Sequence, residues 1–225
     1  MFKLISSIQD MLLKNKSKNL HNLTYKNLTN YQKPDILPFD YFVLNPPPAN
    51  NSEQTKKELD EVVDETLVRN ETSINTILSI DKDPLIIYRT FFANNKMNFP
   101  EEEFTKLYNV LYGIIKELKL FYNRPRPNQI AEFYDINIDV INTKTHSTPS
   151  YPSGHVAYAK LAELLVSEIY PEYSARFSSF TDKVSQARIK QGVHFRSDNE
   201  ASIKLVNAIY PKLKELSNER QRYSK

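Results

Sequence analysis

The chain has 225 residues, of which 40% are hydrophobic and 25% charged, enough for one sizeable core. Its 30 basic and 27 acidic residues are mixed along the chain, so it lacks the basic patches of a nucleic-acid-binding protein. No apolar run approaches the roughly 20 residues of a membrane span, and the lack of cysteine excludes disulfides, thiol catalysis and zinc–thiolate sites. We expect a soluble globular protein, with no nucleic-acid partner and no membrane span, that mildly favours anionic ligands.

The first 48 residues are predicted to form a segment of their own. Apolar residues recur with helical spacing from Met1 to Lys16, which predicts an amphipathic helix. The stretch Lys14–Pro48 is rich in Asn, Lys, Tyr and Pro and has no such period, so we expect an extended arm. Disorder before Pro34 is the competing interpretation. Residues 49–225 are then the main domain.

Four helix-forming segments follow residue 50, namely Ser52–Arg69, Asn70–Ile80, Asp83–Asn94 and Pro100–Asn123. The first is predicted to bury five residues: Leu59, Val62, Val63, Thr66 and Leu67. Strand-like alternation is confined to the short stretch Ile136–Ile141. The predicted fold class is therefore all-α, a single-domain helical bundle with the candidate site at helix ends.

The hexad Ser150–His155 has the composition of an anion-binding helix start. Pro152 fixes the entry of the chain, Ser153 adds a small hydroxyl, and Gly154 leaves the backbone approachable. A helix that begins here directs free N–H groups and its positive dipole end at one point, which is how proteins commonly hold phosphate. His155 would lie within reach of the bound anion.

A second group of polar residues follows about 35 residues later. Arg188 offers a planar fork that matches phosphate oxygens. Gly192 is predicted to end a helix and turn the chain before His194. Asp198 follows four residues later, and a carboxylate in that relation fixes the tautomer of a histidine and raises its basicity.

The residues around Asp198 also have the form of a capping box. Ser197 would be the cap and Glu200 its partner three residues later. Such a box would hold Asp198 in the first turn of a helix, in a position to orient His194.

Prolines 125 and 127 end the helix that carries Lys119. They hold Arg124 and Arg126 in extended geometry. We expect the two arginines to have different targets, and Arg124 to have a structural or rim role.

The order and spacing of Lys119, Arg126-Pro127, Pro152–His155, and then Arg188, His194 and Asp198 resemble the signature of a known family. This is the type 2 phosphatidic acid phosphatase superfamily, which includes vanadium haloperoxidases. Within it, the hexad and the Leu44–Ala49 lead-in are similar to the soluble bacterial class A non-specific acid phosphatases.

The resemblance implies an acid phosphatase that acts on small phosphomonoesters through a phosphohistidine, with no metal or other cofactor, and that vanadate inhibits. His194 would attack phosphorus, Asp198 would orient it, and His155 would protonate the leaving alcohol and then activate water. Five groups would hold the phosphoryl oxygens: the side chains of Lys119, Arg126, Arg188 and Ser153, and the Gly154 backbone N–H. The domain over residues 49–225 would be the catalytic phosphatase domain.

Three alternatives stay open: a phosphatase for lipid phosphates or diphosphates, a vanadate-dependent haloperoxidase, and a non-catalytic phosphate-binding protein. The resemblance implies a periplasmic location, whereas the first residues show no recognisable secretory signal, so a cytoplasmic location also stays open. Homo-oligomer formation is a further open question, and the natural substrate does not follow from these residues.

Overall fold

The structure is a computed structural model that describes residues 16, 18–25 and 44–223, and only the backbone of 218–223. These residues contain helices and no strand, which confirms the all-α fold class, and Ile136–Ile141 is irregular. The predicted helix before Lys16 lies outside the described residues. The prediction of an extended arm is wrong for residues 18–21, because they are helical and Leu20 among them is buried.

All four predicted helices are present as α2 (Glu53–Leu67), α3 (Glu71–Lys82), α4 (Ile86–Asn94) and α5 (Glu101–Tyr122). The elements that follow are α6 (Pro127–Ala131), η1 (Glu132–Tyr134), η2 (Lys144–His146), α7 (Gly154–Ile169), η3 (Pro171–Tyr173), α8 (Ser174–Lys190) and α9 (Arg196–Tyr223).

Both α2 and α3 begin at a side-chain N-cap. Ser52 accepts a hydrogen bond from the Thr55 N–H, and Asn70 accepts one from the Ser73 N–H. These bonds satisfy backbone donors that have no partner inside the helix. One burial prediction for α2 is wrong: Leu67 is 74% exposed, and the last buried residue of the helix is Thr66.

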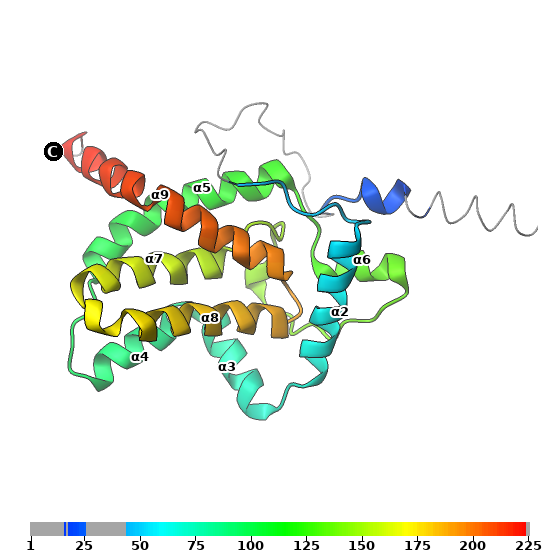
Figure 1. Ribbon diagram of the computed structural model, residues 1–225, viewed down its shortest axis with the longest axis horizontal. Helices are drawn as coiled ribbons and strands as arrows, with labels where there is room; N and C mark the ends of the chain where they lie inside the picture. Colours follow the sequence, from blue (N-terminus) through cyan, green and yellow to red (C-terminus); the bar gives the residue numbers. More distant parts are fainter. Residues whose placement is uncertain (1–15, 17, 26–43, 224–225) are drawn as a thin grey trace, which may run out of the picture.

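Helices α7 and α8 lie side by side at the centre of the molecule, and α9 crosses α7 (Figure 1). The faces that α5, α7 and α9 turn towards one another are fully buried and include Leu107, Val156, Leu161, Val166 and Leu205. Burial of each such side chain contributes roughly 1.5–3 kcal/mol. The N-terminal ends of α7 and α9 and the C-terminal end of α8 meet beside α2, which is where the predicted site residues lie.

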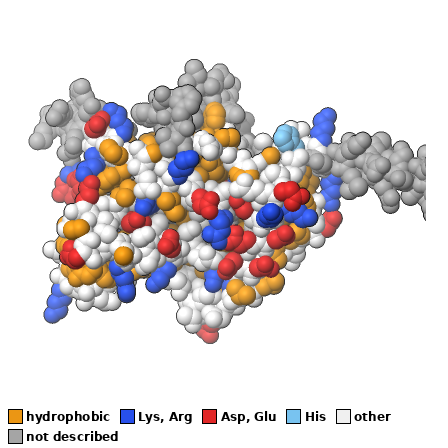
Figure 2. Space-filling view, in the orientation of Figure 1, with side chains coloured by type: hydrophobic (Ala, Val, Ile, Leu, Met, Phe, Trp, Pro, Cys, Tyr) orange, Lys and Arg blue, Asp and Glu red, His pale blue; other side chains and the backbone are white. Residues whose placement is uncertain are grey.

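The surface carries both signs of charge. Figure 2 shows Lys and Arg side chains interspersed with Asp and Glu over the visible face, as the mixed sequence predicts. Within the described ranges, no helix combines the length and the apolar character that crossing a bilayer requires.

Candidate active site

The start of α7 is fixed by hydrogen bonds from two other parts of the chain. The Ser150 N–H donates to the Arg124 carbonyl at 3.0 Å, and the Ser153 N–H donates to the Asp198 carbonyl at 3.1 Å. The Ser202 hydroxyl, from the second turn of α9, donates to the Ser153 carbonyl at 2.8 Å. The positive end of α7 is thereby tied to the first turns of α9.

Gly192 turns the chain between α8 and α9. Its φ of +82° is a conformation that L side chains rarely adopt, and a Cβ there would lie 3.1 Å from the Ile138 side chain. The predicted helix end at Gly192 is therefore correct. The turn brings His194 back beside the end of α8.

His194 and Asp198 form the predicted pair. The His194 Nδ1 lies 3.1 Å from the Asp198 Oδ2, which also accepts a hydrogen bond from the Phe195 N–H at 2.9 Å. Asp198 itself thus caps the first turn of α9. The predicted Ser197 cap is wrong, because Ser197 lies inside α9 and its hydroxyl donates to Glu58 Oε2 at 2.6 Å instead.

The other nitrogen of His194 faces Arg126. The Arg126 Nη1 lies 3.0 Å from the His194 Nε2. Since a guanidinium can only donate, Nε2 is the acceptor and Nδ1 carries the proton that Asp198 accepts. This tautomer leaves the lone pair of the imidazole on Nε2, the nitrogen that a nucleophile would use.

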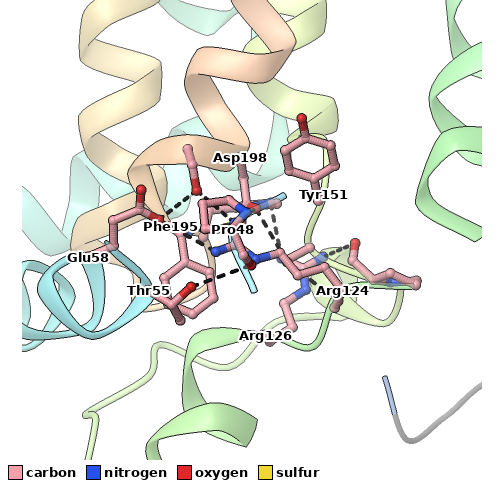
Figure 3. Close-up of polar contacts among 12 residues, drawn as sticks. Pro48, Thr55, Glu58, Arg124, Arg126, Tyr151, Phe195 and Asp198 are labelled. Atoms are coloured by element: carbon pink, nitrogen blue, oxygen red, sulfur yellow. Dashed lines mark hydrogen bonds and ion pairs between the residues drawn. The ribbon is translucent and has the colours of Figure 1, made fainter. Parts of the chain in front are cut away.

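Beneath this pair lies a buried layer of charge made by Arg124, Glu58 and Asp198. Arg124 is 1% exposed, and its Nη1 donates to Asp198 Oδ1 at 2.6 Å while its Nη2 lies 3.5 Å from Glu58 Oε2 (Figure 3). The guanidinium carbon is 4.2 Å from the centre of the Phe195 ring. Arg124 and Arg126 thus have different targets, as predicted, and Arg124 is structural rather than at the rim.

Above His194 a cavity of about 230 Å³ opens, and five of the predicted site residues line it. These are Lys119, Arg126, Gly154, His155 and His194. Asp198 lies behind His194 and does not line the cavity, and neither do Ser153 and Arg188.

Three cations line this cavity, and two of them, Lys119 and Arg126, are bonded to main-chain carbonyls. Lys119 Nζ donates to the Pro149 carbonyl at 2.5 Å. Arg126 donates from Nε to the Thr148 carbonyl at 2.9 Å and from Nη1 to the Val193 carbonyl at 2.8 Å. Neither makes an ion pair with a carboxylate among the described residues, so their positive charge stays available to an anion in the cavity.

Arg188 is held by an acid that the sequence motifs do not indicate. Its Nη1 donates to Asp81 Oδ1 at 2.5 Å and to Gln191 Oε1 at 2.5 Å. Asp81, at the C-terminal end of α3, also accepts from the Thr145 hydroxyl, and its carbonyl oxygen lies 3.0 Å from His155 Nε2. Asp81 therefore contacts both a predicted phosphate ligand and the predicted general acid.

Three comparisons with known proteins bear on this geometry. Residues 106–206, which contain every predicted site residue, match the model of the PAP2 superfamily. This segment is similar to the PAP2 superfamily, and it makes up less than half of the chain. Asp81 and Glu58 lie outside the matched residues.

Two curated relatives are similar over part of this chain. A non-specific acid phosphatase of Salmonella typhimurium is 32% identical over 90 residues, which are 40% of this chain and 36% of the relative. One of Salmonella typhi is 31% identical over 104 residues, 44% of this chain and 41% of the relative. The chain thus spans less than half the length of these relatives. The predicted resemblance to the superfamily and to such phosphatases is confirmed.

A solved structure supports the fold. The transmembrane PAP2-type phosphatidylglycerolphosphate phosphatase of Bacillus subtilis superposes with a TM-score of 0.51 over 73% of this chain and 86% of its own, at 17% identity. The superposed part of this chain thus shares its helical arrangement with that solved structure.

Burial and positive charge lower the pKa values of three titrating groups in the candidate site. Burial, followed by the charge of Arg126, lowers the pKa of His194 well below its usual value, so the imidazole is neutral. Burial and then Arg188 lower the pKa of His155 to about 3. Burial and then Arg126 also lower the pKa of Lys119 well below the usual range. A bound phosphate dianion would raise all three.

Asp81 is the exception to this trend. Burial alone would raise the pKa of its carboxyl, but the hydrogen bonds from Arg188, Thr145 and Gln191 outweigh burial and hold the pKa well below its ordinary value. Asp81 is therefore an anion beside Arg188 over the working range of most proteins.

Four buried donor atoms in and beneath the site have no hydrogen-bond partner among the described residues: the Ser153 hydroxyl, the Arg188 Nε, and the Nε and Nη2 of Arg124. The Ser153 and Arg188 donors belong to the predicted phosphate-binding set, and a buried unsatisfied donor is costly unless a ligand takes its hydrogen bond. In the same described ranges, no three His, Asp, Glu or Cys side chains converge as a metal site would require.

Proposed function

We propose that this protein is a metal-independent acid phosphatase that hydrolyses phosphomonoesters through a phosphohistidine on His194. One observation carries the proposal. His194 is held in a single tautomer by Asp198, its Nε2 accepts a hydrogen bond from Arg126, and both His194 and Arg126 line the cavity that Lys119 and His155 also line.

The first step transfers the phosphoryl group to the protein. Arg126 turns its Nη1 from the His194 Nε2 to a phosphoryl oxygen, and the freed lone pair attacks phosphorus in line. The bond from phosphorus to the ester oxygen breaks, and His155, protonated because the bound dianion raises its pKa, gives its proton to the leaving oxygen. The low pKa of His194 keeps this nucleophile neutral in mild acid. Asp198 balances the positive charge that develops on the ring.

The second step returns the protein to its starting state. His155, now neutral, takes a proton from water, the resulting hydroxide attacks phosphorus, and the phosphorus–nitrogen bond breaks. Inorganic phosphate leaves and His194 is again neutral. The same residue thus acts as an acid and then as a base.

Positive charge around the phosphoryl group supplies the electrostatic part of catalysis. Lys119 and Arg126 would exchange carbonyl partners for phosphoryl oxygens, and the unpaired Arg188 Nε and Ser153 hydroxyl would add hydrogen bonds. The Gly154 N–H at the start of α7 would complete the set. Charge spread over the equatorial oxygens of a phosphoryl group is commonly stabilised by such groups together with metal ions.

The first test is hydrolysis of p-nitrophenyl phosphate between about pH 4 and 8, the range around an unperturbed histidine pKa. It is run with a chelator, with and without vanadate, on wild type, His194→Ala and His21→Ala. His21 is a matched control because it bonds to Asn51 on the surface. We expect chelator-resistant, vanadate-inhibited hydrolysis that only His194→Ala abolishes.

Other results would point to the alternatives. Near-wild-type turnover by His194→Ala would overturn the nucleophile assignment, and chelator inhibition reversed by a metal would overturn the metal-free mechanism. Faster hydrolysis of a lipid phosphate or a diphosphate would place the substrate in that class. Bromide oxidation by peroxide after vanadate loading, without ester hydrolysis, would indicate a haloperoxidase. Phosphate binding without any turnover would indicate a binding protein.

A further inference from the structure

A second cavity adjoins the phosphate site. It measures about 420 Å³ and shares three lining residues with the smaller cavity: Thr145, His155 and Tyr158. Tyr158 stands beside the start of α7, since a Cβ on Gly154 would lie 3.5 Å from its ring. The two cavities therefore meet at His155, the residue that would protonate the leaving oxygen.

Aromatic and apolar side chains form much of this second cavity. The Tyr108 and Tyr158 rings meet edge to face at 4.7 Å, and Phe104 stacks on Tyr108 at 5.9 Å. Pro84 and Leu85 add apolar surface from the segment before α4. Burial raises the pKa of both tyrosines, so their hydroxyls are neutral hydrogen-bonding groups.

The charged residues that line the second cavity give it no preference for a second phosphate. Two are carboxylates, Asp81 and Asp83, and two are cations, Lys82 and Arg89. Arg89 is already engaged, because it donates to Asp83 at 2.6 Å and to Glu101 at 2.7 Å. Asp81 is bonded to Arg188. The cavity is thus balanced in charge, unlike the phosphate site beside it.

We propose that the second cavity holds the organic part of the substrate, and that this part carries an aromatic ring. The inference rests on the proposed function, since it assigns the leaving-group side of the same site. The leaving oxygen must lie at His155, so the alcohol attached to it extends into the cavity beyond. A planar ring fits an edge-to-face aromatic wall, and polar groups on the ring would meet neutral hydroxyls and the Asn109 amide.

Binding measurements test this inference without requiring turnover. Titration calorimetry on wild type compares benzylphosphonate with methylphosphonate, which differ by one ring. We expect the aromatic ligand to bind about tenfold tighter or more, since a buried ring contact of this kind is worth roughly 1.4 kcal/mol.

Two matched substitutions locate the effect. Asn109→Trp places a bulky ring at the mouth of the second cavity, and Asn75→Trp makes the same change at an exposed helical position of α3 that lines neither cavity. We expect Asn109→Trp to reduce the ratio of the two dissociation constants several-fold, and Asn75→Trp to leave it unchanged. Tyr108→Leu, which keeps an apolar side chain at this position, should reduce the ratio as well.

Turnover gives the second arm. For phenyl phosphate and for a nucleoside monophosphate, kcat/KM should each exceed that for glycerol 2-phosphate more than tenfold in wild type. Both ratios should fall in Asn109→Trp. A comparison of the two aromatic esters then shows which kind of ring is preferred. A wild-type binding ratio near one, a ratio that Asn109→Trp does not change, or tighter binding of a long alkyl phosphonate would overturn the inference. An aromatic preference in binding with no turnover would contradict the proposed function alone.

Discussion

Buried positive charge occurs twice around His194, and the two regions satisfy it differently. In the layer beneath His194, Arg124 pairs with the carboxylates of Asp198 and Glu58. In the cavity above it, Lys119 is bonded to carbonyl oxygens and Arg126 to carbonyl oxygens and the neutral His194 Nε2, with no carboxylate partner among the described residues. The first arrangement balances its cation with carboxylates, whereas the second retains net positive charge for an anion. Asp198 connects the two, because one of its oxygens bonds to Arg124 and the other to His194.

The largest expected effect comes from Asp198→Asn, which acts on both regions. The amide cannot balance the charge that develops on His194 and no longer fixes the productive tautomer, so we expect kcat to fall on the order of 10²–10⁴-fold. Steady-state kinetics on p-nitrophenyl phosphate measure this, and a circular dichroism spectrum checks the fold. Wild-type kcat in a folded variant would contradict the role of Asp198.

Arg124→Ala tests the lower layer by itself. It leaves Glu58 and Asp198 as buried carboxylates without their cation, which should destabilise the fold by about 3–5 kcal/mol. Arg196→Ala is the matched control, since Arg196 pairs with Glu61 at the surface and an exposed pair is worth about 0–1 kcal/mol. Both values come from urea unfolding. Equal losses of unfolding free energy in the two variants would show that the buried ion pairs of Arg124 stabilise the fold no more than the exposed pair of Arg196.

Acid should destabilise the ligand-free protein because His155 and His194, in the cavity region, resist protonation in the folded state. His155 has a pKa near 3 in the folded state, and His194 is also lowered, so the unfolded chain binds protons that the folded chain does not. Stability is therefore lost as pH falls below about 6.5, by up to roughly 2 kcal/mol per histidine between pH 7 and 5.

Urea midpoints at the two pH values measure this loss. Inorganic phosphate should shrink it, because a bound anion raises both pKa values. Equal midpoints at pH 7 and 5 without phosphate would contradict the shifts.

A smaller change is expected for Asp81→Asn. The Asp81 carboxylate is a negative charge on Arg188, so its removal should strengthen the binding of inorganic phosphate by about tenfold. Asp83→Asn is the control, because that carboxylate pairs with Arg89 instead. Calorimetry measures both, and weaker phosphate binding in Asp81→Asn would mean that Asp81 serves mainly to position Arg188.

The sequence predicted the parts of this site that depend on local order. Gly192, His194 and Asp198 lie within seven residues, so one turn and one helix start fix their geometry. The start of α7 at Gly154 follows from local sequence in the same way.

The parts that depend on distant packing were not predicted. Asp81 meets Arg188 across 107 residues, and Ile80-Asp81-Lys82 reads as an ordinary helix end. Glu58 stands on a polar helix, and it is buried against Arg124 and Ser197, which lie far from it in the sequence. The Ser197 cap failed for the same reason, since the buried Glu58 takes its hydroxyl.

The central claim, a covalent phosphoryl group on His194, is tested most directly by trapping it. His155→Ala should slow the attack of water more than the loss of an activated aryl leaving group, so a rapid alkaline quench during p-nitrophenyl phosphate turnover should capture the intermediate. Mass spectrometry of the digest should then place one acid-labile phosphoryl group on His194. A phosphoryl group on another residue, or a stoichiometric burst of p-nitrophenol with no modified peptide, would contradict the account.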